Sequence, residues 1–360
     1  DISWLVPRLK LLDVSIYDVD HKRHLLHFSE ISVSLNWSES IKNMRPELGD
    51  IFVFGMDLQV ERQQTGEILV QGVEISGSNE VDASAPERLM SLFSDSSLYL
   101  VDSTIHWLDY KNNSQRLDFA NVNLTMINNK PGHKIAIDME LPAAYGRHIQ
   151  LMADFEGEIN NPHAWQGRAY VSVENLQLDS WLNDYWEFIE FPGAGQLTAD
   201  AWISFKNFSI ESVSLNLQAD DLVLYHLDDD VKSWKLEHIS ALMKWLRTDD
   251  GMKIDIRDLE MQRNNAKWLQ KSAVALQIHD HRKFKLTTNY ARLDDIVYFA
   301  GIADELMPEF SFSALNVVDE RSVVGDLYDV TFSIDIDRPE DLVAHAYFRD
   351  FGYQSVSDVP

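Results

Sequence analysis

The chain has 360 residues and a formal net charge of −27, from 58 acidic and 31 basic side chains. This charge excludes a nucleic-acid-binding protein and argues against flat docking on an anionic bilayer. Cysteine is absent, which excludes disulfides, thiolate nucleophiles and cysteine-held metals, and no apolar run reaches the roughly 18–20 residues of a membrane-spanning helix.

The first quarter of the chain alternates apolar and polar residues, a pattern typical of half-buried strands. Strands are predicted around residues 9–16 and 24–37, followed by a loop or helical turn over 38–45. A hairpin over 51–60 and 67–75 turns near Gly66, which suits a positive φ. Ser84, Pro86 and Glu87 then have the spacing of a helix start, with Leu89, Met90 and Phe93 as its apolar side.

The rest of the chain repeats this alternation with two changes of period. The clearest hairpin spans 197–219, where Leu197, Ile203, Leu215 and Leu217 share one face. Helical spacing replaces the alternation at Trp181–Ile189, before Pro192, and again over residues 294–307, before Pro308. The other strands are predicted at 98–108, 117–127, 134–141, 149–156, 168–174, 222–227, 234–245, 252–261, 273–279, 284–290, 330–336 and 342–348.

About twenty strands with three short helices form an unusual total, because an ordinary sheet has about five strands. Short connections favour antiparallel pairing of sequence neighbours. Three arrangements of the apolar face remain open. Two sheets can pack as a sandwich with a dry core, the sheet can close into a membrane barrel, or it can curl into a trough filled by something other than protein.

Sequence motifs for chemistry are missing. The chain has no phosphate-binding glycine loop, no G-x-S-x-G elbow and no H-E-x-x-H sequence. His21, His24 and His27, with Asp18 and Asp20, can be drawn as a metal cluster, but polar hairpin tips produce such clusters freely. We therefore expect no enzyme, no catalytic residue, no metal site and no cofactor. A carbohydrate-active enzyme would need a pair of carboxylates on the concave face of the sheet. The face predicted to be concave is apolar, which argues against this class of enzyme.

Several segments resemble the AsmA-like family of Gram-negative envelope proteins, in particular its long members. One is the hairpin P-E-L at Pro46–Leu48 with Ile51, Gly55 and the T-G-E-I at Thr65–Ile68. Others are the run from Leu141-Pro142 through Ile149–Gly157 to Trp165–Gly167, the helix start Leu176–Leu182, and the strand Gly195–Trp202. The resemblance covers most of the chain.

The resemblance implies a long, highly curved antiparallel sheet that forms an elongated hydrophobic groove with a few short helices. It implies one continuous periplasmic segment over 1–360, with sub-segments of about 1–82, 83–192 and 193–360. Family members carry an N-terminal helix in the inner membrane and continue beyond this segment, so we expect both parts to be missing here. Family members are implicated in moving phospholipid towards the outer membrane. The expected partners of this chain are therefore phospholipids, the inner membrane through the missing helix, and envelope proteins.

A lipid-transport protein would bind acyl chains along the apolar face. The candidate groove residues are Ile135, Ile137, Met139, Ile149, Leu151, Phe155, Val171, Val173, Leu197, Ile203, Phe205, Val213, Leu215, Leu217, Ile254, Ile256, Val274, Leu276, Ile278, Phe332, Ile334 and Ile336. The alternative for each of these residues is that it packs in an ordinary dry core of the protein. The alternative function is a structural or adaptor β-sandwich of the envelope that binds protein partners along its edges.

Overall fold

The computed structural model describes residues 8–17, 24–45, 47–71, 73–74, 97–111, 115–129, 132–157, 162–185, 193–207, 209–225, 233–280, 282–298, 323–335 and 337–353. They fold mainly into strands, twenty in number, hydrogen-bonded as a mixed β-sheet. The chain divides into unit 1, residues 1–186 and 204–209, and unit 2, residues 187–203 and 210–360. Each unit is described by itself.

Unit 1 begins with two long strands and a short helix, and then alternates strands with short turns. Its elements are β1 (Arg8–Tyr17), β2 (His24–Leu35), α1 (Trp37–Asn43), β3 (Leu48–Phe54), β4 (Asp57–Arg62), β5 (Ile68–Val70), β6 (Val73–Glu74), β7 (Leu98–Asp109), β8 (Gln115–Asn129), β9 (Gly132–Glu140), β10 (His148–Glu156), the 3-10 helix η2 (Pro162–Ala164), β11 (Gln166–Gln177) and α3 (Leu178–Tyr185).

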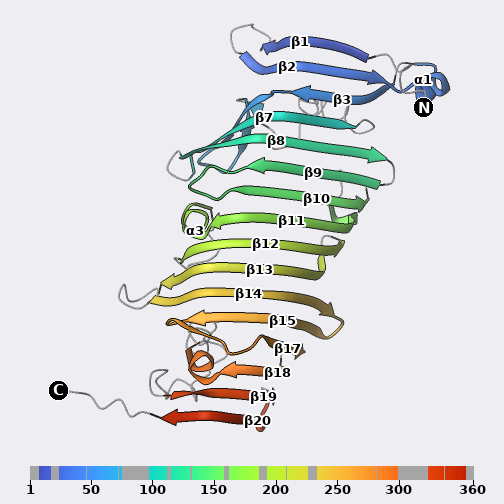
Figure 1. Ribbon diagram of the computed structural model, residues 1–360. Helices are drawn as coiled ribbons and strands as arrows, with labels where there is room; N and C mark the ends of the chain where they lie inside the picture. The colour runs from blue at the N-terminus through green and yellow to red at the C-terminus, as the bar shows by residue number, and fades with distance from the viewer. Residues whose placement is uncertain are drawn as a thin grey trace. The chain divides into compact units, whose positions relative to one another are not determined.

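Strands of unit 1 pair mostly with their neighbours in sequence, and β7 to β11 lie side by side in chain order (Figure 1). The expectation of a purely antiparallel sheet is wrong at one place. Strand β7 runs parallel to β3 and β4, with Ile51 beside Leu98 and Asp57 beside Thr104. A parallel pair needs a crossover connection, and the long chain segment between β4 and β7 allows one.

Unit 2 continues the same antiparallel pattern. Its elements are β12 (Gly193–Lys206), β13 (Ser209–Tyr225), β14 (Ser233–Thr248), β15 (Gly251–Arg263), β16 (Ala266–Lys267), β17 (Ser272–His279), β18 (Lys283–Arg292), β19 (Val323–Asp335) and β20 (Arg338–Tyr353), of which residues 204–206 and 209 are grouped with unit 1. The pairs β13–β14, β14–β15, β15–β17, β17–β18, β18–β19 and β19–β20 are all antiparallel.

The predicted helices are confirmed where the structure describes them. Helix α1 occupies the segment expected to be a helical turn, and α3 begins at Leu178, three residues before the apolar spacing starts at Trp181. Residues 293–298 are helical, at the start of the helix predicted over 294–307. The helix predicted from Ser84 lies outside the described residues. Among the described residues, none of the helices is long and apolar enough to span a bilayer.

Many long strands contain one aspartate or asparagine in the left-handed region of φ. Asp102 in β7 has φ 49° and Asn121 in β8 has φ 50°, and the pairing register between these strands shifts around both residues. Gly55, with φ 57°, lies between β3 and β4. It is next to the irregular part of β7, because its N–H donates to Val101 O at 2.9 Å. These residues are β-bulges, which bend a strand and increase its twist. Neighbouring strands of unit 1 therefore bend at the same level.

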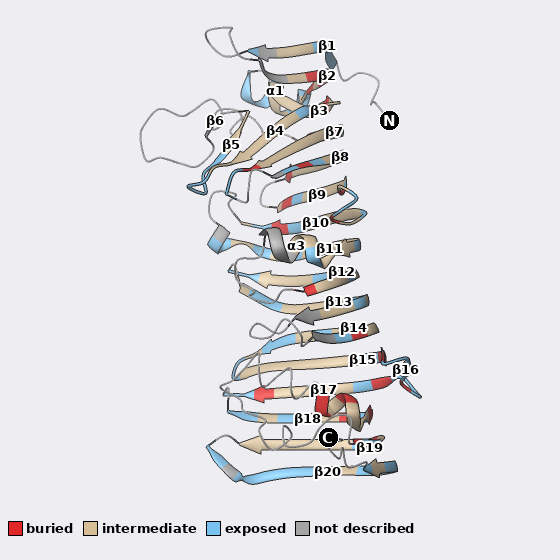
Figure 2. Ribbon diagram, turned by 90° about the vertical axis from the view of Figure 1, so that its left-hand side faces the viewer, coloured by how far each residue is buried: buried red, intermediate tan, exposed pale blue. Residues whose placement is uncertain are grey.

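Two clusters of fully buried residues define the dry core. The cluster in unit 1 contains Phe28, Ile51, Val53 and Met56. The cluster in unit 2 is larger and contains Leu236, Ala241, Leu259, Met261, Trp268, Tyr290 and Ala291. Much of each strand is only partly buried, as the intermediate colouring along β7 to β11 shows in Figure 2. Fully buried residues are therefore local features, not a continuous layer.

Candidate functional site: two apolar strips

Two unbroken rows of apolar side chains cross eight strands of unit 1. Directly paired residues on neighbouring strands share a face, so each row can be followed from the register alone. The first row is Leu9, Val33, Ile51, Leu98, Met126, Ile135, Ala153 and Ala169, and the second is Leu11, Ile31, Val53, Leu100, Leu124, Ile137, Leu151 and Val171. We call these sixteen residues the unit 1 strip.

The opposite face of the same strands is polar and paired. Asp138 lies opposite Gln150, and His148 Nε2 is 3.0 Å from an Asp138 carboxylate oxygen. Lys134 and Asp154 form an ion pair at 3.4 Å. The polar side chains on this face therefore form hydrogen bonds and ion pairs with one another. In the described residues, the face without such side-chain pairs is the apolar one.

Most of the unit 1 strip is half-buried, and its edge is open. Ile51 and Val53 are buried in the unit 1 core, but the other members on β2 and β7 to β11 are intermediate. On the edge strand β1, Leu9 and Leu11 are 63% and 46% exposed. A dry core between two packed layers would bury these side chains almost completely. The described residues therefore leave the unit 1 strip without a covering layer.

Aromatic clusters lie near both ends of β10. At one end Phe155 lies between His133 and Trp165, with ring centroids 5.3 and 4.6 Å away. At the other end Tyr145 contacts the Trp181 ring edge-on at 5.4 Å, and Trp181 Nε1 donates to Tyr145 O at 2.8 Å. The half-buried part of the strip lies between these clusters, where the side chains are aliphatic.

Unit 2 carries a similar row across seven strands, which we call the unit 2 strip. It consists of Val213, Trp245, Ile254, Leu276, Leu286, Phe332 and Ala344. The row beside it contains Leu215, Met243, Ile256 and Val274, and then Thr288 interrupts the apolar sequence. On the other side of the unit 2 strip the apolar face continues at β18, because Phe284 pairs with Ile278 and Ile334.

Part of the apolar face in unit 2 is covered by the chain itself. Ile296, in the helical segment 293–298, packs against the buried unit 2 cluster, as do Ile256 and Val274. Next to Ile296, Asp295 is 1% exposed and accepts hydrogen bonds from Arg263 Nε and, at 2.6 Å, from Trp268 Nε1. The Arg263 guanidinium also stacks over the Tyr298 ring at 4.1 Å. This network holds the segment against the sheet.

One carboxylate of this network, Asp294, has a shifted pKa. Burial raises the pKa of Asp294, and the neighbouring Asp295 charge raises it further, whereas Arg292 and Arg263 oppose the shift. Arg292 Nη2 lies 2.6 Å from Asp294 Oδ2, and Arg263 Nη2 lies 3.3 Å from it. Two arginines thus face two adjacent aspartates, an arrangement that compensates charge and carries no exposed reactive group.

The predicted groove residues occupy three kinds of position. Phe155 and Ile278 are fully buried, and Ile336 lies outside the described residues. The remaining nineteen are half-buried, as expected of one face of a sheet. The register brings Ile135, Ile137, Leu151 and Val171 into the unit 1 strip, and Val213, Ile254, Leu276 and Phe332 into the unit 2 strip. Whether any of them binds lipid stays a prediction.

Sequence reasoning missed the N-terminal half of the unit 1 strip. Leu9, Leu11, Ile31, Val33, Leu98, Leu100, Leu124 and Met126 were expected to be strand residues but not candidates for the site. Their alternation was visible, but the parallel step from β3 to β7 that aligns them with the later strands was not.

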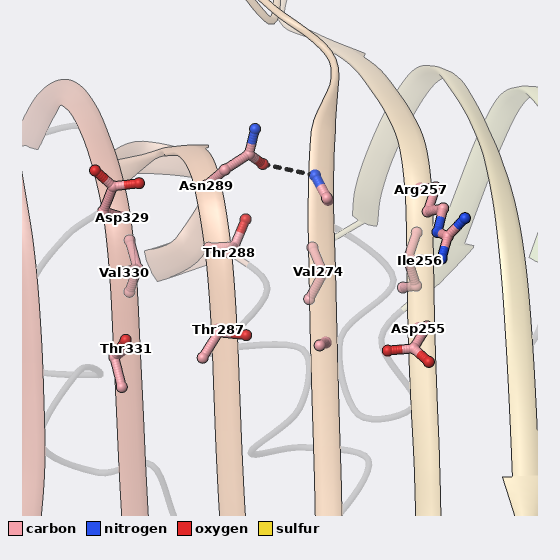
Figure 3. Close-up of a pocket in the computed structure, with 12 residues that line it drawn as sticks. Asp255, Ile256, Arg257, Val274, Thr287, Thr288, Asn289, Asp329, Val330 and Thr331 are labelled. Carbon is pink, nitrogen blue, oxygen red and sulfur yellow. Dashed lines mark hydrogen bonds between the residues drawn. The ribbon is translucent and has the colours of Figure 1, made fainter.

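The polar face of unit 2 has a shallow depression of about 380 Å³ over β15, β17, β18 and β19 (Figure 3). Its centre is hollow because Ala273 and Ala275 occupy β17 there. Asp255, Arg257, Thr287, Asp329 and Thr331 surround it, and Asn289 Oδ1 accepts a hydrogen bond from Ala273 N at 2.6 Å. No group of three or more His, Cys, Asp or Glu in the described part of the chain is placed to hold a metal. The depression lies on the face opposite the apolar rows.

The geometry defines a class: a mainly β protein whose sheet is polar on one face and carries continuous apolar rows, mostly half-buried in the described residues, on the other. A comparison with protein families gives the particular family. The model of the YhdP family, described as "YhdP protein", matches residues 1–360, and the chain belongs to this family. Membership indicates an envelope protein, and the family is not one of known enzymes. No curated protein matches the chain.

Proposed function

We propose that the chain is a bridge-like lipid transport protein, whose apolar strips carry the acyl chains of phospholipids across the periplasm between the inner and outer membranes. The observation that carries the proposal is the pair of unbroken apolar rows across β1 to β11, half-buried and without a covering layer in the described residues. Family membership supports it, because the family indicates an envelope protein.

The strip has the dimensions of lipid tails. Eight strands give seven spacings of about 4.8 Å, so the unit 1 strip is roughly 34 Å long. One leaflet contributes about half of the roughly 30 Å hydrocarbon core of a bilayer. The unit 1 strip is therefore long enough for about two acyl chains end to end, and we expect more than one phospholipid per chain.

Movement along the strip requires no chemistry. Aliphatic side chains bury an acyl chain through the hydrophobic effect, which is proportional to area and has no preferred direction. Similar residues repeat at every strand, so neighbouring positions bind a tail about equally well and a tail can slide. Headgroups remain in water beyond the strip. We propose no catalytic residue and no cofactor.

The test is to purify the chain without detergent, extract it with organic solvent and quantify phospholipids by mass spectrometry. We expect Leu151→Asp to lower the phospholipid content several-fold, because the carboxylate would lie within the unit 1 strip, between Ile137 and Val171. Met152→Asp is the matched control, since Met152 is the next residue, is 42% exposed and lies on the polar face. A phospholipid-free extract from the folded wild-type chain would refute the proposal.

A second candidate function has one observation in its favour. Strand β20, which pairs with β19 in the described residues, exposes Leu342, Val343, Tyr347, Phe348, Phe351 and Tyr353, each between 48% and 67%. An open strand edge with exposed apolar side chains can bind a protein by strand addition, as in an envelope adaptor. A clean extract together with a stable protein complex would favour this adaptor function over lipid transport.

A further inference from the structure

Helix α1 exposes an apolar stripe that no other part of the described chain covers. Trp37, Ile41 and Met44 are 49%, 73% and 95% exposed. Spacings of four and three residues place side chains on the same side of a helix. Trp37 and Ile41 therefore share one side of the helix, and Met44 follows at its C-terminal end; we call these three exposed residues the α1 stripe.

The α1 stripe is held in a fixed conformation. The Asn36 side chain caps the helix by accepting a hydrogen bond from Glu39 N at 3.3 Å. Ser40 Oγ donates to Asn36 O at 2.6 Å and accepts from Glu47 N at 2.8 Å. These bonds cap the N-terminus of the helix and fasten Ser40 to Glu47, the residue before β3. The stripe thus loses little conformational entropy when a surface covers it.

Met44 has a backbone conformation that glycine or asparagine adopts more easily than methionine does. It ends α1 with φ 51° and ψ 30°, in the left-handed region where glycine or asparagine is preferred. At 95% exposure, its side chain gains no packing that compensates for this conformation. An apolar side chain in a strained, exposed position is better explained by contact with an external surface than by folding.

We propose that the α1 stripe inserts into the surface of a lipid bilayer. The segment 36–47 contains Glu39 and Glu47 against Lys42 and Arg45, a net charge of zero in a chain of −27. The pairs Lys42–Glu39 and Arg45–Glu47 are 3.3 and 2.6 Å apart. This segment can therefore approach a bilayer without the repulsion that the acidic remainder of the chain experiences. Tryptophan favours the headgroup level, and the side chains of Ile41 and Met44 enter the acyl boundary.

The size of the α1 stripe argues against a protein partner. Even at about 200 Å² for each side chain, three residues bury roughly 600 Å², and a stable protein interface needs about 800 Å² on each side. A bilayer has no such requirement, because lipids surround a protruding side chain on all sides.

Its position links the α1 stripe to the edge of the unit 1 strip. Helix α1 directly follows β2, and Val33 at the end of β2 pairs with Leu9, the most exposed member of the strip. Figure 1 shows α1 beside the ends of β2 and β3. The proposed contact thus places a bilayer next to the open edge of the strip, although membrane binding by α1 does not depend on lipid transport.

The experiment is flotation of the 360-residue chain with vesicles of phosphatidylcholine, with and without one fifth phosphatidylglycerol. We expect the wild-type chain to float with neutral vesicles and less with anionic ones. The triple variant Trp37→Gln, Ile41→Gln, Met44→Asn should lose at least five-fold in bound fraction. Its melting temperature should not fall, because the three side chains are exposed and asparagine suits the left-handed position.

Two controls separate the possible outcomes. Leu269→Gln removes a side chain that is 73% exposed in unit 2 and should leave flotation unchanged. Leu151→Asp should lose bound phospholipid but still float, so failure of the transport proposal is distinguishable from failure of this one. Flotation of the triple variant at the wild-type level overturns the inference. So does a wild-type dimer in light scattering that the triple variant converts to a monomer.

Discussion

At the scale of single residues, Asp295 is the position where we expect a substitution to destabilise the fold most. Its carboxylate is 1% exposed and neutralises Arg263, whose side chain is 4% exposed. Removing one member of a buried ion pair leaves the other charge in a medium of low polarity. Loss of the Asp295 carboxylate would therefore be destabilising mainly because the Arg263 charge would stay buried without it.

We expect Asp295→Ala to lower the free energy of unfolding by about 3–5 kcal/mol. Arg263 would lose its closest carboxylate and keep Asp294 at 3.3 Å, and the Trp268 indole N–H would lose its hydrogen bond to Asp295. Urea unfolding followed by tryptophan fluorescence measures the loss. Asp249→Ala, in an exposed turn, is the comparison and should change stability by less than about 0.5 kcal/mol. An equal effect of the two variants would contradict this account.

The polar face has its own pH dependence. Hydrogen bonds from Arg116 and then from His106 hold the pKa of Asp118 below its usual 3.8. The unfolded chain therefore takes up this proton at a higher pH than the folded chain does. The stabilisation is present above about pH 4 and is lost as the pH falls through the lower folded pKa.

We expect Asp118→Asn to weaken the loss of stability between about pH 4 and pH 2.5, because the variant has no carboxylate to protonate. Denaturant midpoints of the wild type and the variant, measured at pH 7, 4 and 3, give the comparison. The difference between the two proteins should shrink as the pH decreases. A difference independent of pH would show that the hydrogen bonds of Asp118 make no proton-linked contribution.

At the scale of elements, the β-bulges determine where strands bend. Asp102 and Asn121 lie on either side of the paired residues Ser103 and Val122 of β7 and β8, and Asn123 Oδ1 accepts a hydrogen bond from Asp102 N at 3.1 Å. Aspartate and asparagine tolerate a positive φ better than other non-glycine residues do. The sequence of each strand therefore contains its own bending point.

The prediction for this scale is that Asn121→Val destabilises the chain by about 1–3 kcal/mol, whereas Asn121→Gly is nearly neutral. Valine is β-branched and cannot adopt φ near 50° without strain, but glycine can. Asn121 is exposed, so lost packing does not complicate the comparison. Thermal unfolding of both variants measures the effect, and similar losses would indicate that the asparagine side chain, not its backbone conformation, is important.

At the scale of the whole molecule, the transport proposal predicts how damage in the two units combines. If lipid passes along both strips in series, one block is enough to stop the flow. Leu151→Asp in the unit 1 strip and Leu276→Asp in the unit 2 strip should each reduce lipid transfer by at least ten-fold. The double variant should be no worse than either single variant.

A fluorescent-lipid transfer assay with the chain in the envelope of living cells measures this combination. Met152→Asp and Gln277→Asp, on the polar faces of the same strands, should transfer lipid normally. Losses that multiply in the double variant would contradict passage in series. They would fit two separate lipid-binding surfaces.

The sequence alone determined the strands, the sidedness of the sheet and the family resemblance. Alternation with period two is local, so residues such as Ile135, Ile137 and Leu151 could be assigned to one face before their partners were known. The family match over residues 1–360 confirms the resemblance, and the described strands confirm the mainly β fold. The expected groove and the three sub-segments stay predictions.

Tertiary structure alone decided which apolar residues are exposed and which are covered. The parallel step from β3 to β7 aligns Leu9 and Leu98 with Ile135, and Ile296 of the helical segment 293–298 packs against the same buried cluster as Ile256 and Val274. Phe155 and Ile278 alternate in sequence like their neighbours yet are fully buried. Alternation gives the face to which a side chain points, but burial depends on what packs against that face. Those contacts join residues far apart in the chain, so no local pattern contains them.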